Sequence, residues 1–207
     1  MAGPEARDEG PEQVVRRLHD ALRARDADAV AACYRPDARF QDPVFGELAP
    51  GEVRDMWRML LARAQDLEVR TVDVQGTGGA SASATTSFRY TLSWTGRRVH
   101  NTIHSAFVVQ EGRITLQHDA FPFHAWAAQA FGWRGRLLGR SARLRRRVQR
   151  QARAGLQAFR ARSAAGPYGA TAEAKAATSA AGSAGAAGGG GAGAAEAGDG
   201  VPPGRVL

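Results

Sequence analysis

The sequence predicts an α+β domain in which helices cover one face of a curved antiparallel sheet. The first observation is a change of period, because apolar residues recur at helical spacing before Leu67 and at every second position after it. The second is a series of short glycine-containing turns at 76–79, 94–97 and 110–113, which join neighbouring strands into an antiparallel meander. A curved sheet covered in this way leaves room for a cavity between the sheet and the helices.

Three helices are expected before the meander. The first begins near Pro11, where a proline suits the first turn. A break at Arg25–Asp26 separates it from a short second helix, and the loop with Pro50–Gly51 precedes a third. Their inward stripes are Val14, Val15, Leu18 and Leu22; then Val30, Cys33 and Tyr34; then Val53, Met56, Trp57, Leu60 and Leu61.

The stretch from Tyr34 to Phe45 is the most informative part of the chain. It predicts the end of a helix, a tight turn at Pro36–Asp37 and a short strand that places Phe40 and Asp42 on one face. A carboxyl group beside apolar side chains at a strand end is a candidate general base. The alternative is that Asp42 caps the following turn at the surface, as an aspartate before a proline often does.

The meander and the C-terminal elements follow in order. The four strands are expected at 67–75, 82–94, 98–110 and 113–121. A short helix at 123–131 ends at the glycines of 132–135, and an amphipathic helix covers 136–162, with Leu137, Leu144, Val148, Leu156 and Phe159 near one stripe.

The 207 residues divide into four parts by composition. Residues 1–10 are polar and expected to be disordered, 11–132 form the domain, 133–162 form the basic helix, and 163–207 form a disordered tail rich in alanine and glycine. The single cysteine, Cys33, excludes an internal disulfide. Without an apolar run of membrane-spanning length or a signal peptide, the expected location is cytoplasmic.

The positive charge is concentrated in residues 133–162, which we call the arginine arm. The arm holds 11 arginines and no acidic residue, whereas residues 1–132 hold 15 arginines and 17 acidic residues. The arm could dock on its own domain or a dimer partner with its arginines solvated, lie on an anionic membrane, or bind nucleic acid. Docking or solvation is preferred and membrane contact comes second; nucleic acid comes third, because aromatic residues do not interleave with the arginines.

The pattern Tyr34-x-Pro36-Asp37-Ala38-x-Phe40-x-Asp42-Pro43, placed between helices and a meander, resembles the SnoaL-like branch of the nuclear transport factor 2-like superfamily over roughly residues 11–131. The resemblance implies a cone, a cystatin-like α+β roll with a mostly apolar pocket. The piece Asp37–Val44 is similar to the stretch of ketosteroid isomerase that carries its general base, which implies that Asp42 is the base. By the same comparison, the places of that enzyme's oxyanion tyrosine and aspartate fall on Leu18 and His104.

Strand alternation suggests which side chains accompany Asp42 in the pocket. His100, Thr102 and His104 share one face of their strand, and Gln117, Asp119 and Phe121 share one face of the next. We therefore expect Asp42, His104 and Asp119 as catalytic residues, although His104 and Asp119 could instead form a polar pair without chemistry. The expected pocket lining is Leu18, Trp57, Phe88, Tyr90 and Phe121.

The sequence supports two functional hypotheses and does not decide between them. One is an enzyme that performs isomerisation, another proton transfer or hydrolase-type chemistry on a small carbonyl or polyketide-like compound, with Asp42 as base. The other is a non-catalytic ligand-binding or assembly module with the same pocket. The expected partners are a small apolar molecule and a second copy in a homodimer. No metal or cofactor is expected, because Cys33 stands alone, the histidines form no paired motif and no phosphate-binding glycine loop is present.

Overall fold

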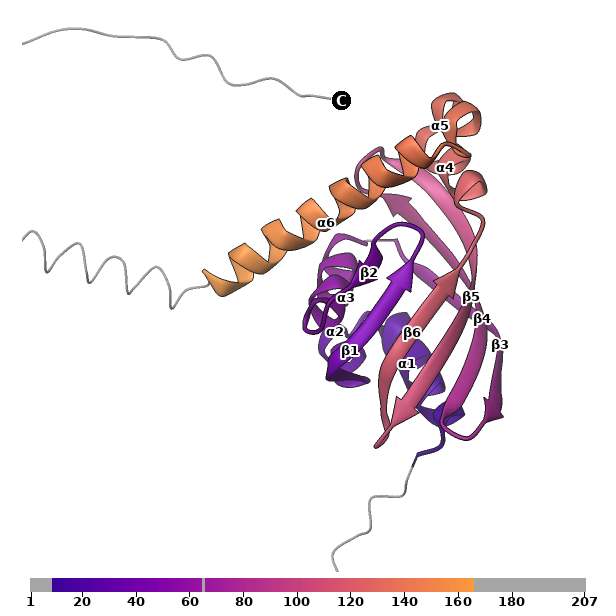
Figure 1. Cartoon of the computed structure of the whole chain (residues 1–207), viewed down its shortest axis with the longest axis vertical. Helices are drawn as coiled ribbons and strands as arrows, with labels where there is room; N and C mark the ends of the chain where they lie inside the picture. Colours follow the sequence, from indigo (N-terminus) through magenta and orange to yellow (C-terminus); the bar gives the residue numbers. More distant parts are fainter. Residues whose placement is uncertain (1–8, 65, 166–207) are drawn as a thin grey trace, which may run out of the picture. The chain divides into compact units, whose positions relative to one another are not determined.

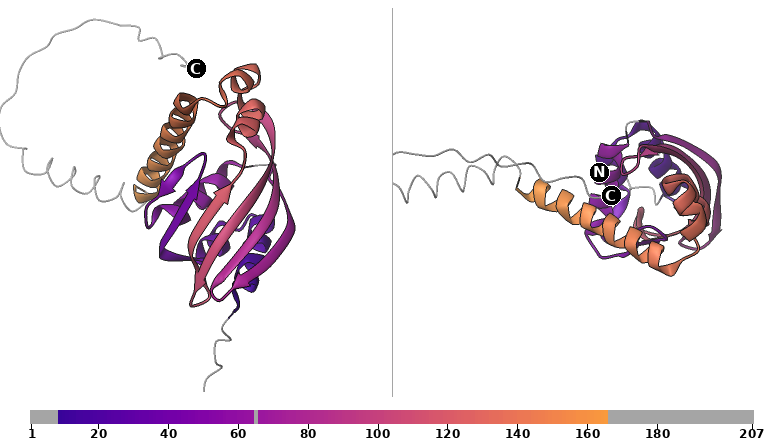
Figure 2. Two further views of the ribbon diagram at one scale, coloured as in Figure 1. Left: turned by 45° about the vertical axis from the view of Figure 1, so that its right-hand side comes forward. Right: turned by 90° about the horizontal axis from the view of Figure 1, so that it is seen from above.

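A six-stranded curved sheet forms the framework of the domain (Figures 1 and 2). The computed structural model describes residues 9–64 and 66–165, so the disorder expected for the first residues and for the tail beyond residue 165 lies outside the described residues. The strand order is β2-β1-β6-β5-β4-β3, and every neighbouring pair is antiparallel except β1 with β6. The α+β class and the curved sheet are as the sequence predicted. The strands are β1 (Tyr34–Asp42), β2 (Gly46–Leu48), β3 (Glu68–Gly78), β4 (Ser81–Leu92), β5 (Arg97–Gln110) and β6 (Arg113–Ala120).

Three N-terminal helices, α1 (Pro11–Ala24), α2 (Ala27–Ala32) and α3 (Glu52–Arg63), supply most of the core opposite the sheet. Helix α1 begins with a proline in its first turn and ends where Arg25 adopts a left-handed conformation, with φ of 56°. The side chain of Asp26 then caps α2 by accepting the N–H groups of Asp28 and Ala29. Helix α3 follows Gly51, whose φ of 82° suits glycine. The three helix starts, and the end of α1, therefore fall at residues that the sequence marks.

The turn expected at Pro36–Asp37 is absent, and β1 runs without a break from Tyr34 to Asp42. The pairing of β1 with β6 shifts register between Tyr34 and Arg39, so Pro36 lies where the regular ladder of hydrogen bonds is interrupted. A proline, which has no N–H, therefore costs no interstrand hydrogen bond there. The three-residue strand β2 was also not expected, and its pairing places Asp42 opposite Gly46. Asp42 thus lies at the last paired position before a tight hairpin.

The arginine arm forms two helices instead of one. After α4 (Phe123–Phe131), Gly132 has a φ of 64° and the chain turns into α5 (Trp133–Leu138), followed by α6 (Ala142–Ala164). Helix α5 lies so close to α4 that a Cβ atom on Gly135 would be 1.8 Å from the carbonyl oxygen of Ala127. A helix therefore forms where the sequence suggested only a break, because its glycines allow close packing. No helix in residues 9–64 or 66–165 is long and apolar enough to cross a membrane.

Helix α6 contacts the hairpin between β1 and β2 and the first turns of α3. Val148, Ala152 and Leu156 are buried on its inner face. The Arg153 guanidinium donates to the carbonyl oxygens of Phe45, at 2.9 Å, and Glu47. Further along the helix, Arg160 pairs with Asp55 at 3.0 Å. The arm therefore holds the hairpin that follows Asp42.

Candidate active site

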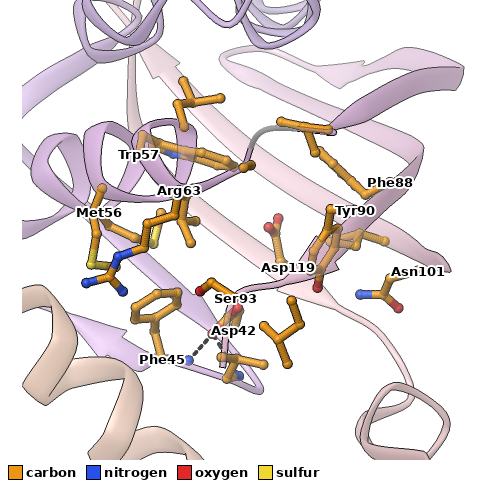
Figure 3. A pocket seen from close by; sticks show the side chains of 18 of the residues that line it. Asp42, Phe45, Met56, Trp57, Arg63, Phe88, Tyr90, Ser93, Asn101 and Asp119 are labelled. Atoms are coloured by element: carbon orange, nitrogen blue, oxygen red, sulfur yellow. Dashed lines mark hydrogen bonds between the residues drawn. The ribbon is translucent and has the colours of Figure 1, made fainter. Parts of the chain in front are cut away.

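A cavity of about 170 Å³ lies between α3 and the concave face of the sheet (Figure 3). Its walls come from α3, from β1 and the β1–β2 hairpin, from β4 to β6 and from α4, so distant parts of the chain meet there. Apolar and aromatic side chains make up most of the lining, which favours an apolar ligand. The aromatic members are Phe40, Phe45, Trp57, Phe88, Tyr90, Trp94, Phe121 and Trp126.

Asp42 borders this cavity at the end of β1 (Figure 3). Because Pro43 cannot donate a hydrogen bond, the chain turns, and Asp42 Oδ1 accepts the N–H of Val44 at 2.9 Å and that of Phe45. Burial raises the pKa of Asp42 from 3.8 to about 7; the N–H of Phe45 opposes this shift, and the nearby Asp119 adds to it. Asp42 therefore caps the turn and also presents a carboxyl group to the cavity that titrates near neutral pH.

A second carboxyl group, Asp119 of β6, lines the same cavity and is only 6% exposed. Its Oδ1 accepts the Nε2–H of Gln117 at 2.8 Å, and the hydroxyl of the fully buried Tyr34 donates to Gln117 Oε1. Burial raises the pKa of Asp119 from 3.8 to about 6, against the lowering effect of the Gln117 and Ser105 side chains. The chain from Tyr34 through Gln117 fixes the orientation of this carboxyl group.

Tyr90 and Asn101 add uncharged polar groups to the cavity wall. Trp126 Nε1 donates to the hydroxyl of Tyr90 at 2.9 Å, so the Tyr90 proton points elsewhere. Burial raises the pKa of Tyr90, and the charge of Asp42 adds to this, so the hydroxyl stays protonated. Asn101 of β5 is 6% exposed and also lines the cavity. Both side chains are donors that a ligand oxygen could use.

His104 does not belong to this site, and the expectation that it faces the cavity is wrong. It is exposed on the outer face of β5, with Nδ1 3.1 Å from Thr85 Oγ1. Its neighbour Ser105 pairs with Asp119, so the odd-numbered residues of β5 face inwards. Alternation identifies two faces of a strand but not which face is inside, and here both faces carry polar residues. Asn101 was missed for the same reason.

Four of the five residues expected to line the cavity do so, and Leu18 does not. Trp57, Phe88, Tyr90 and Phe121 all border the cavity. Leu18 does not, because α1 packs over β3 and β4, where Leu18 is buried in the main core. As to metals, no three His, Cys, Asp or Glu side chains in the described part of the chain gather closely enough to hold an ion.

Comparison with known proteins identifies the domain. The family model of the SnoaL-like domain matches residues 15–117, and this part of the chain is a SnoaL-like domain of the nuclear transport factor 2-like superfamily. An LEH-like epoxide hydrolase of M. tuberculosis is similar in structure, with 23% identity, a TM-score of 0.51, and coverage of 62% of this chain and 92% of that one.

A second solved structure, IdmH, a putative polyketide cyclase from Streptomyces antibioticus, has 19% identity and a TM-score of 0.50. The alignment covers 58% of this chain and 98% of that one. A comparison with proteins of curated function finds no match. At these identities the likeness establishes the fold, and the chemistry has to be argued from the side chains.

Proposed function

We propose that the domain is an enzyme that moves a proton on a small apolar carbonyl or polyketide-like compound, with Asp42 as general base. The observation that carries this proposal is a carboxyl group with a pKa of about 7 at the wall of an apolar cavity. A base whose pKa lies near the working pH combines a large ionised fraction with useful basicity. An aspartate that served only as a surface turn cap would not show such a shift.

The proposed step starts with the substrate carbonyl in the cavity. Asp42 removes a proton from the carbon next to the carbonyl, the C–H electron pair forms a C=C bond, and negative charge moves to the carbonyl oxygen. The Tyr90 hydroxyl and the Asn101 amide are the candidate donors to that oxygen. Asp42 then returns the proton to another carbon in an isomerisation. In an aldol-type closure the enolate instead attacks a second carbonyl, and the protonated Asp42 gives its proton to the alkoxide that forms.

Asp119 is proposed to assist as an acid. With a pKa of about 6 it is mostly ionised in the ligand-free cavity at neutral pH. An apolar ligand that displaces water raises this pKa further, because burial disfavours the charged form. A protonated Asp119 could then donate to the developing oxyanion, and Gln117 would hold it in place.

A non-catalytic ligand-binding module is the second candidate. It is favoured by the two backbone N–H groups that already engage Asp42 Oδ1, since they give this carboxylate a structural role. In that case the cavity would bind an apolar molecule, and replacement of Asp42 would change affinity without any change in the ligand.

The test is hydrogen–deuterium exchange next to the carbonyl in a panel of hydrophobic cyclic ketones and 1,3-diketones, followed by proton NMR in D₂O. The protein should accelerate exchange in at least one compound, with a rate that rises through about pH 7 and then levels off. Asp42→Asn should lower the catalysed rate by about 10²–10⁴-fold.

The matched control is Asp37→Asn, which changes an exposed carboxylate on the same strand. It should leave the exchange rate unchanged. Ligands that quench the fluorescence of the cavity tryptophans without any catalysed exchange would support the binding module. Full exchange activity in Asp42→Asn would exclude Asp42 as the base.

A further inference from the structure

Helix α5 has its large apolar side chains on the outside. The buried residue within the helix is Gly135, and Gly139, just after the helix, is also buried. Both glycines pack against α4. Trp133 is 70% exposed, Leu137 73% and Leu138 49%. We call these three side chains the α5 patch. Single exposed apolar residues are ordinary, but three on one six-residue helix form an apolar patch, which is a candidate interaction surface.

The surroundings of the α5 patch are strongly cationic. Arg134, Arg136 and Arg140 are exposed within or beside α5, and Arg134 stacks over the Trp133 ring at 5.3 Å. Residues 133–162 contain no acidic side chain. Of the 11 arginines of the arm, Arg160 is the one that forms an ion pair with an acidic group of residues 9–64 and 66–165. The net positive charge therefore remains available to a partner.

Most of the apolar stripe of the arm, which the membrane alternative would place against lipid, is covered by the protein itself. Val148 is buried in the structure, and Leu144 and Phe159 pack against the core. The lipid-facing candidate in the arm is therefore the α5 patch, of which the expected stripe included only Leu137.

We infer that the α5 patch and the arginines around it bind the surface of a bilayer that contains anionic lipid. Tryptophan and leucine would enter the boundary between headgroups and acyl chains, while the arginines contact the lipid phosphates. A second copy docking by the same patch would bring two cationic surfaces together, which is unfavourable. A nucleic acid would satisfy the arginines but leave the two leucines exposed. The positive charge of the arginines and the apolar α5 patch together thus favour an anionic membrane as the partner. The inference does not depend on the proposed function of the cavity.

The experiment is co-sedimentation of the full chain with vesicles of phosphatidylcholine alone or mixed with phosphatidylglycerol, at low and high salt. We expect sedimentation with the mixed vesicles only. The variant Trp133→Ser, Leu137→Ser, Leu138→Ser should reduce the partition coefficient at least about tenfold. Its fold should be intact, because the three side chains are exposed. The matched control is Leu116→Ser, at an exposed leucine of β6, which should bind like the unsubstituted protein.

Trp133 provides an independent signal. Trp57 and Trp126 are buried and Trp94 is half-buried, so Trp133, at 70% exposed, is the tryptophan most accessible to a bilayer. Mixed vesicles should shift its fluorescence to the blue, and Trp133→Phe should remove the shift while most of the binding remains. Absence of sedimentation with mixed vesicles at low salt would overturn the inference, as would equal sedimentation of the triple variant. If sedimentation velocity shows a dimer that the triple variant dissociates, without any vesicle binding, the patch is covered by a second copy instead.

Discussion

An Asp42→Asn variant is expected to be more stable than the unsubstituted protein by about 2–4 kcal/mol at about pH 8.5. Folding raises the pKa of Asp42 from 3.8 to about 7, so the ionised carboxylate opposes folding. Each pKa unit corresponds to about 1.4 kcal/mol. The expected gain in stability is set somewhat below the full value of the shift, because water in the cavity would partly solvate the ionised carboxylate. The Asn oxygen can still accept the N–H groups of Val44 and Phe45, so the turn keeps its cap.

The pH dependence of this gain follows from the direction of the pKa shift. The cost of ionised Asp42 is complete above the folded pKa of about 7 and absent below 3.8, where the carboxyl group is protonated in both states. The advantage of Asp42→Asn should therefore shrink as the pH falls from about 8.5 to about 4. Urea unfolding at several pH values measures it. A variant less stable than the unsubstituted protein at alkaline pH would show that the turn cap is the main role of the carboxylate.

A Leu156→Ala variant should lower the free energy of unfolding by about 2–5 kcal/mol, because the removed atoms leave a cavity in a packed site. Leu156 is 1% exposed and belongs to the main core cluster, although it lies far along α6. Leu137→Ala in α5 is the matched control: the same chemical change at a side chain 73% exposed should cost less than about 0.5 kcal/mol.

The comparison of these two leucines tests whether α6 is part of the folded domain. Urea unfolding followed by tryptophan fluorescence is suitable, because Trp57, Trp94 and Trp126 line the cavity. If both variants unfold at the same urea concentration as the unsubstituted protein, α6 contributes no packing.

Much of the fold could be predicted because its signals are local. The strands β3 to β6 follow from period-two patterning and glycine turns, and α1 follows from a proline start and a helical stripe. The parallel pairing of β1 with β6 could not be predicted, since it joins residues about eighty positions apart and leaves no local mark. The short strand β2 and the glycine-faced helix α5 were missed because both are formed by packing against other elements.

The candidate site could be predicted only in part. Asp42 and Asp119 both border the cavity, as expected. Asp42 was expected there because a carboxylate beside apolar side chains at a strand end is conspicuous, and Asp119 because strand alternation placed it on the face of Phe121. The inward face of β5 could not be chosen, because His104 and Asn101 alternate with similar polarity on a strand of 14 residues. The Trp126 bond that orients Tyr90 comes from α4, which is distant in sequence, and only the tertiary structure shows it.

The proposed role of Asp42 is tested most directly by a carbon-detected NMR titration of the aspartate carboxyl groups, with Asp42 assigned through the Asp42→Asn spectrum. The carboxyl group of Asp42 should titrate with a midpoint of about 7. Exposed Asp37, whose pKa is lowered by its hydrogen bond with Arg35, serves as the internal reference and should titrate below its ordinary value of 3.8. A midpoint for Asp42 near 3.8 would contradict the proposal, because a carboxyl group of ordinary acidity would be a turn cap in contact with water and not a base in an apolar cavity.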